Sequence, residues 1–226
     1  MIRNTGKPIH AFWRKWILDY SLGELIGIGI SATIARFLFV GFPENGIIPE
    51  SLITVTLLTI AGVSEGFIIG YIQWRSFAKL IPDFRPVLWI LVTTISTLAG
   101  WLFILPPGIV FITFLSQVAL ISANNSILYT LLVGLAFGGL IGIPQSFIVK
   151  QHFKGAIIWI ISNAVGWMFS FLIIYLSLSL FPYLPSVVGK LLLIALACVF
   201  SGLVQGLVTG TSLHFLMSIR KPDPVS

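Results

Sequence analysis

The residue best placed for chemistry is Glu65, an acid that stands 13 residues after Leu52 within a long apolar run. By helical rise it lies roughly 20 Å from one face of a bilayer. An ionised carboxylate at that depth loses several kcal/mol of solvation, so it must be protonated, paired or in contact with water. An acid inside a membrane indicates a binding or transport site; a hydrogen bond that bridges two helices is the structural alternative.

Other polar residues accompany Glu65. Glu24, Asn163 and Gln205 fall in the same half of their apolar runs, so we expect them to share a polar layer with it. Gln73 and Gln145 stand at the ends of glycine-rich helical faces, where we expect them, like Thr209, to form hydrogen bonds between packed helices. The alternative is a cleft open to the cytoplasm in which they meet a ligand. The candidate residues for binding a ligand or ion are therefore Glu65, Gln73, Gln145, Glu24 and Gln205.

The sequence offers no pattern typical of an enzyme. His10, His152 and His214 are scattered and no HExxH occurs, so zinc chemistry lacks its ligands. Ser64 has no basic partner by spacing, and the single cysteine, Cys198, is expected to be a small packing residue. We expect no catalytic residue, no metal and no cofactor. A site shared by the two later histidines is the one alternative left open.

Composition defines the class of protein. The 226 residues are 57% hydrophobic and only 9% charged, with a mean hydropathy of +1.04. These values are typical of a polytopic membrane protein. At about 20 residues per helix plus short connections, the length allows six spans and leaves no room for a soluble domain.

We therefore predict an all-α integral membrane protein with one transmembrane domain over residues 1–226. Trp13 and Trp16 are expected at the membrane interface before the first span. Pro106 and Pro107 end the third span, and the apolar stretch after them is too short to cross and return. The predicted spans are 20–42, 52–74, 87–105, 127–149, 156–181 and 187–217, with a short interfacial or re-entrant segment at 108–121.

The basic residues predict the orientation. With six spans, eleven of the 13 Lys and Arg residues fall on one side, and only Arg36 and Lys190 fall on the other. This asymmetry places both termini in the cytoplasm. It also accounts for the net charge of +6, so the charge does not indicate nucleic-acid binding.

A stripe of small residues occurs three times at the spacing i, i+4, i+8 and i+11, which lies on one helical face. Glycines spaced in this way let helix backbones approach closely in lipid. We therefore expect all of these glycines at helix contacts. The copies are Gly62, Gly66, Gly70 and Gln73, then Gly134, Gly138, Gly142 and Gln145, then Cys198, Gly202, Gly206 and Thr209.

The stripes belong to predicted spans two, four and six, which run in the same direction. Spans three and five share a second pattern, a tryptophan followed by a Gly-Trp pair: Trp89 with Gly100 and Trp101, and Trp159 with Gly166 and Trp167. We expect two hairpins, spans two with three and four with five. Span one, with its own tryptophan after Arg14 and Lys15, would complete a third hairpin with span six in permuted order.

The pattern G-x-x-x-G-x-x-Q-W-R from Gly66 to Arg75, followed by a basic loop, a tryptophan and Gly-Trp, resembles a repeat of small polytopic bacterial membrane proteins without an assigned activity. The resemblance covers most of residues 62–210. The second copy departs from it, with Ser146 and Phe147 where Trp74 and Arg75 stand. It implies a multi-span protein of the bacterial inner membrane, with an internal photosynthetic membrane as the alternative location.

Two classes of function fit these features. The first is an accessory or scaffold protein that binds a partner membrane protein, a second copy of itself or lipid through its glycine-striped helices. The second is a carrier of a small solute or ion, or the substrate-binding subunit of a transporter, which uses the acid within the membrane. A stable stoichiometric partner would favour the first class, and a small molecule that co-purifies would favour the second.

Overall fold

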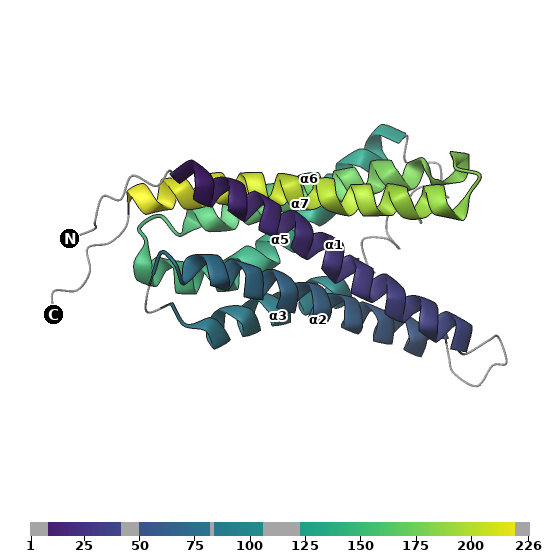
Figure 1. The fold of residues 1–226 in the computed structure, drawn as a ribbon, viewed down its shortest axis with the longest axis horizontal. Coiled ribbons are helices and arrows are strands. Elements are labelled where there is room, and N and C mark those ends of the chain that lie inside the picture. The colour runs from purple at the N-terminus through teal and green to yellow at the C-terminus, as the bar shows by residue number, and fades with distance from the viewer. Residues whose placement is uncertain (1–8, 42–49, 82–83, 106–122, 220–226) are drawn as a thin grey trace.

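The computed structural model describes residues 9–41, 50–81, 84–105 and 123–219 (Figure 1). The described part of the chain is helical and contains no strand. The short segment predicted at 108–121 lies outside the described residues, so its interfacial or re-entrant character stays a prediction. The helices are α1 (Ile9–Gly41), α2 (Glu50–Phe77), α3 (Pro86–Phe103), α5 (Ala123–His152), α6 (Ile157–Ser179), the short 3₁₀ turn η1 (Phe181–Tyr183) and α7 (Val187–Ser218).

Five stretches among the described residues are long and apolar enough to cross a membrane. They lie within a few residues of the predicted spans, because each apolar run is bounded by prolines, glycines or charges. The remaining predicted span, 20–42, is not among these stretches; it overlaps α1, which begins earlier than expected, at Ile9, and ends at Gly41. The five stretches are Leu52–Phe77, Pro86–Phe103, Ser126–His152, Ile157–Tyr183 and Val187–Ser218.

Local sequence explains where the helices begin. Pro86 occupies the first turn of α3 after Arg85, whose backbone is extended. Ser186 caps α7, because its hydroxyl accepts a hydrogen bond of 3.0 Å from the backbone N–H of Gly189. Gly155 adopts a φ of 76°, which lets the chain turn sharply between α5 and α6.

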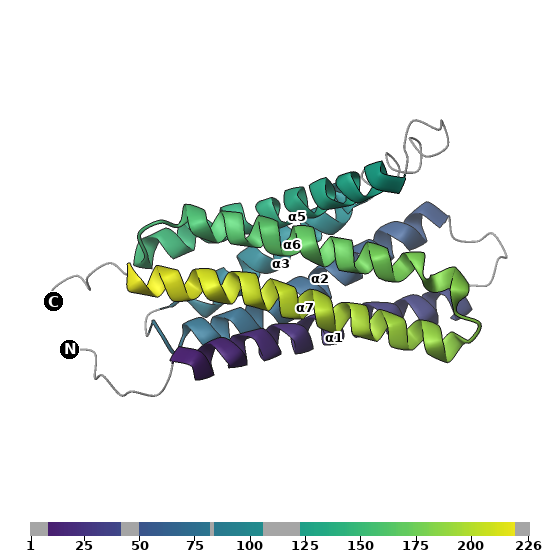
Figure 2. The same cartoon turned by 90° about the horizontal axis from the view of Figure 1, so that it is seen from above.

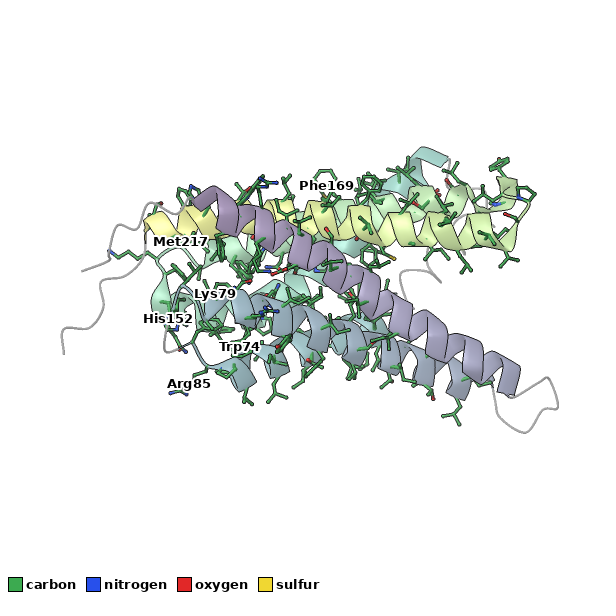
Figure 3. The ribbon with its side chains drawn as sticks, viewed as in Figure 1. Trp74, Lys79, Arg85, His152, Phe169 and Met217 are labelled. Carbon is green, nitrogen blue, oxygen red and sulfur yellow. The ribbon has the colours of Figure 1, made fainter. Side chains whose placement is uncertain are left out.

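The helices form a closed ring in which each one packs against two neighbours. The order around the ring is α1, α2, α3, α5, α6, α7 and back to α1 (Figures 1 and 2). The start of α1 and the end of α7 lie at the same end of the bundle, and Lys79, Arg85 and His152 lie toward that end too (Figure 3). The first and last helices are therefore neighbours.

The glycine stripes of α2, α5 and α7 face α3, α6 and α1. A Cβ atom built on Gly62 or Gly66 would lie 2.7 Å from the Cα of Leu98 or Thr94 on α3. Those of Gly134 and Gly138 would overlap backbone atoms of α6, and a Cβ on Gly202 would lie 2.6 Å from the Cα of Ser21 on α1. The glycines that meet the partner helix in this way are Gly62, Gly66, Gly70, Gly134, Gly138, Gly142, Gly202 and Gly206.

Trp16 is placed differently from its expected position at the interface. Its side chain is 1% exposed and lies inside the bundle, where Phe77, Trp89 and Trp159 are also buried. Trp16 lies inside the bundle because α1 begins several residues earlier than predicted, so that its first turns pack alongside the last turns of α7. Close by on the surface, Lys15 and Asp19 form an ion pair of 2.8 Å one helical turn apart.

Candidate functional site

Three tryptophan side chains each donate a hydrogen bond from one helix to its neighbour. Trp89 Nε1 donates to Gln73 Oε1 at 3.1 Å, which links α3 to α2. Trp159 Nε1 donates to Gln145 Oε1 at 2.8 Å, and Trp16 Nε1 donates to the Thr209 hydroxyl at 3.0 Å. Each acceptor is the last polar residue of a glycine stripe. The three tryptophans thus hold the stripes in related positions around the ring.

The glutamines also link one hairpin to the next. Gln73 Nε2 donates to the Tyr20 hydroxyl at 2.8 Å, and Gln145 Nε2 donates to the Thr93 hydroxyl at 2.8 Å. Gln145 Nε2 is also 3.2 Å from Gln73 Oε1, which therefore accepts two hydrogen bonds. Both side chains are fully buried, and their amide groups already bond to the protein.

An aromatic cluster fills the interior of the bundle beside this network. The ring of Phe77 lies 4.9–5.7 Å from the rings of Trp16, Trp89 and Trp159, measured between centroids. Leu213 on α7 is fully buried in the same cluster. Since the cluster draws on helices from all around the ring, it closes the bundle at the end where α1 begins and α7 ends.

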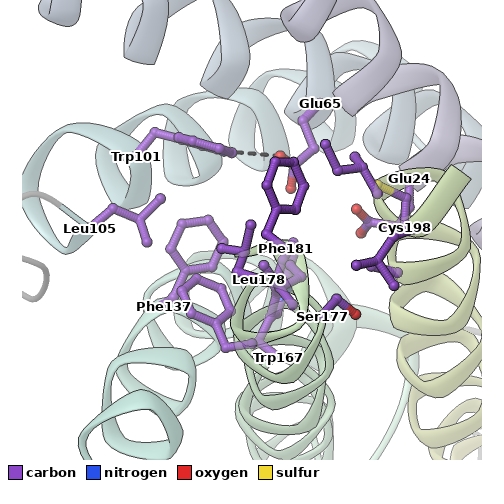
Figure 4. Close-up of a pocket in the computed structure, with 15 residues that line it drawn as sticks. Glu24, Glu65, Trp101, Leu105, Phe137, Trp167, Ser177, Leu178, Phe181 and Cys198 are labelled. Carbon is purple, nitrogen blue, oxygen red and sulfur yellow. Dashed lines mark hydrogen bonds between the residues drawn. The ribbon is translucent and has the colours of Figure 1, made fainter. Parts of the chain in front are cut away.

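A cavity of about 320 Å³ occupies the other half of the bundle (Figure 4). All six long helices contribute to its wall. The wall is mostly aliphatic and aromatic, and Ala197 and Cys198 on α7 form part of it. The aromatic residues of the wall are Trp101, Phe137, Trp167, Phe171 and Phe181.

Glu65 and Glu24 line this cavity from neighbouring helices, α2 and α1. Glu65 is 2% exposed; its Oε2 accepts a hydrogen bond of 2.9 Å from Trp101 Nε1, while its Oε1 has no partner among the described residues. Glu24 is 1% exposed, and its Oε1 likewise has no partner there. Both acids therefore keep an acceptor atom for a group that enters the cavity.

The position of Glu65 is one of three related positions in the ring. Glu65, Phe137 and Ser201 each stand eight residues before the last polar residue of a stripe. Glu65 meets Gly27 of α1, and Phe137 meets Gly100 of α3, where a Cβ would lie 2.5 Å from its ring. The backbone oxygen of Ser201 accepts a hydrogen bond from α6 at 3.2 Å. Only one of the three positions carries an acid, so packing alone does not require one.

Further buried polar atoms lack partners among the described residues. Trp167 Nε1 is one, in the cavity wall. In the described part of the chain, both amide atoms of Gln205 and Ser201 Oγ lack partners where α7 packs against α6, and Asn163 Oδ1 lacks one on α6, which packs there against Gly138 and Gly142 of α5. The absence of a side chain at Gly166 leaves space for Gln205, since a Cβ atom on residue 166 would overlap Gln205 Oε1. Buried polar groups of this kind bind water or a ligand.

The predicted site residues thus divide into two groups. Glu65 and Glu24 meet at the cavity, and Gln205 is buried without lining it. Gln73 and Gln145 belong to the hydrogen-bond network instead. Sequence reasoning did not assign Trp101 and Trp167 to the site, although their Gly-Trp pairs marked them. Among the described residues no three His, Cys, Asp or Glu side chains come together.

The fold and the cavity define an all-helical protein with apolar helices suited to a membrane. Comparisons with protein-family models, with curated proteins and with solved structures each find no match to this chain. The resemblance to repeat-containing bacterial membrane proteins therefore stays a prediction.

Proposed function

We propose that this chain binds a small, largely apolar solute in the cavity between its helices, and that it acts as a carrier or as the substrate-binding membrane subunit of a transporter. The observation that carries the proposal is a cavity within apolar helices whose wall includes two buried carboxylates with unpartnered oxygens. Its volume of about 320 Å³ falls within the range of roughly 300–1,000 Å³ that small-molecule sites occupy.

In this proposal α1 is the sixth span, and three helical hairpins repeat around an axis along the membrane normal. The charge asymmetry then places the aromatic cluster toward the cytoplasm and the cavity toward the opposite face. The shortest span, α3, has 18 residues and a helical length of about 27 Å, close to the hydrocarbon thickness of about 30 Å.

The closed end of the bundle favours a carrier or binding subunit over a channel. The cavity stops at the glutamine and tryptophan network, where side chains such as Gln73, Gln145 and Trp89 are fully buried. A solute would therefore reach the acids from one side only. Passage to the other side would require the tryptophan and glutamine bonds to rearrange, which is the kind of alternating access that carriers use.

The scaffold function remains the alternative, but the glycine stripes do not support it. A scaffold would need these stripes on its surface, whereas the glycines of α2, α5 and α7 face α3, α6 and α1 of the same chain. The exposed apolar side chains, such as Phe67 and Leu132, suit lipid contact. A partner that stays bound in stoichiometric amount after purification would favour the scaffold.

The experiment is to measure binding of indole, a neutral apolar probe, to the purified full chain in lipid nanodiscs. We expect saturable binding that Ala197→Phe abolishes, because Ala197 lines the cavity and a phenyl group would fill it. Ala136→Phe is the matched control, since Ala136 is exposed on the surface of α5. Equal binding by the two variants, or no saturable binding, contradicts the proposal.

A further inference from the structure

We propose that the solute is an organic ammonium ion, whose charged nitrogen is held between Glu24 and Glu65 and whose hydrocarbon part packs against the aromatic wall. This inference rests on the proposed function and names the class of substrate. It commits to a cation that carries N–H donors, because Glu24 and Glu65 each offer the cavity a carboxylate oxygen that has no partner in the described part of the chain.

The charges in the cavity are unbalanced. Two acids line it, and the described lining residues include no Lys, Arg or His. A buried carboxylate without a counter-charge is strongly unfavourable, and two near one another are more so. In the empty cavity the acids avoid this cost by holding a proton or water, whereas a cation that enters lets them ionise and is attracted to them in a low dielectric. Binding of a cation is therefore favoured over binding of a neutral molecule of the same shape.

The geometry at the acids suits an ammonium group. The bond from Trp101 Nε1 occupies one oxygen of Glu65 and orients the carboxylate, so that Oε1 is left free. Glu24 Oε1 is free on the neighbouring helix. A primary ammonium has three donors, so it can bond to both oxygens at once. A quaternary ammonium cannot donate, and should bind more weakly.

The wall favours an organic cation over a metal ion. Calcium takes six to eight oxygen ligands, and magnesium takes six in octahedral geometry. Apart from the acids, the wall consists mainly of aromatic and aliphatic side chains such as Phe137, Phe171 and Ile194. Aromatic faces attract ammonium groups and also bury the hydrocarbon attached to them. The free N–H of Trp167 leaves one donor for an oxygen on the ligand.

Two probes of the same size test the inference, 2-phenylethylamine, which is protonated at pH 7, and 2-phenylethanol, which is neutral. Binding to the full chain in nanodiscs of zwitterionic lipid is measured by calorimetry. We expect the amine to bind about tenfold more tightly than the alcohol, or better. In Glu65→Gln and Glu24→Gln the amine should lose this preference, while binding of the alcohol is retained. Asp19→Asn is the control, because Asp19 lies on α1 and pairs with Lys15 at the surface.

The outcomes separate the two proposals. If amine and alcohol bind equally, or if both glutamine variants keep the preference, the cation inference is overturned while the apolar cavity stands. If neither probe binds, the proposed function fails as well. Because a glutamine variant can fail to fold, a second matched pair, cyclohexylmethylamine and cyclohexylmethanol, is compared in the unmodified protein. Tighter binding of the amine supports the inference, and equal binding contradicts it.

Discussion

Trp101 and Glu65 are joined across α3 and α2 by a hydrogen bond of 2.9 Å from the indole N–H to one carboxylate oxygen. The bond fixes the carboxylate at the cavity wall and leaves its other oxygen free. This one hydrogen bond therefore joins α2 to α3 and also orients the Glu65 carboxylate.

The first prediction concerns that bond. Trp101→Phe leaves a buried acceptor without its donor, so it should lower the free energy of unfolding by roughly 1–3 kcal/mol. Glu65→Gln should be milder, because the amide oxygen of glutamine can accept the same bond. Thermal unfolding in detergent of both single variants and the double variant measures the coupling. Strictly additive effects would mean that the two side chains do not interact.

The second prediction compares two adjacent glycines on α5. Gly138 lies against the backbone of Asn163, where no Cβ fits, whereas a Cβ on Gly139 would meet nothing within 4 Å. Gly138→Ala should therefore lower the melting temperature by several degrees, while Gly139→Ala should leave it unchanged or raise it slightly, since alanine favours helix by up to about 1 kcal/mol. Equal melting temperatures for the two variants would show that α5 and α6 do not pack in this register.

The third prediction concerns the network of glutamines. Gln145 bonds to Thr93, Gln73 and Trp159 on three other helices, whereas Thr209 bonds across helices to Trp16 alone. Gln145→Leu leaves several buried groups without partners and should destabilise the protein more than Thr209→Val does. Chemical unfolding in mixed micelles measures both. A larger effect at Thr209 would contradict the proposed order of importance.

The fourth prediction concerns the topology. In a Cys198→Ser background, a cysteine that replaces Tyr183, which is 81% exposed after α6, should react with an impermeant thiol reagent added to intact cells. A cysteine that replaces Lys154, in the exposed turn before α6, should react only after the cells are opened. Reaction of position 154 in intact cells would contradict the six-span arrangement with cytoplasmic termini.

The residue ranges of the helices could be predicted from the sequence, because residues such as Pro86 and Gly155 mark where each apolar run begins or ends. The pairing of α1 with α7 also followed, from the third glycine stripe and the tryptophan of α1. The hydrogen-bond donor that faces Glu65 could not be predicted, because the rotation of α3 about its axis decides which residue that is. The cavity could not be predicted either, because it depends on how the end of α1 diverges from the start of α7 (Figure 1).

The central claim is that a small ammonium ion occupies the cavity between Glu24 and Glu65. The most direct test is X-ray diffraction from crystals of the full chain soaked with 2-(4-bromophenyl)ethylamine, whose bromine gives an anomalous signal. The account predicts a bromine peak among Phe137, Trp167 and Phe171, with the amine nitrogen within hydrogen-bonding distance of the two acids. A cavity filled by the protein's own side chains, or a bromine peak only on the lipid-facing surface, would contradict it.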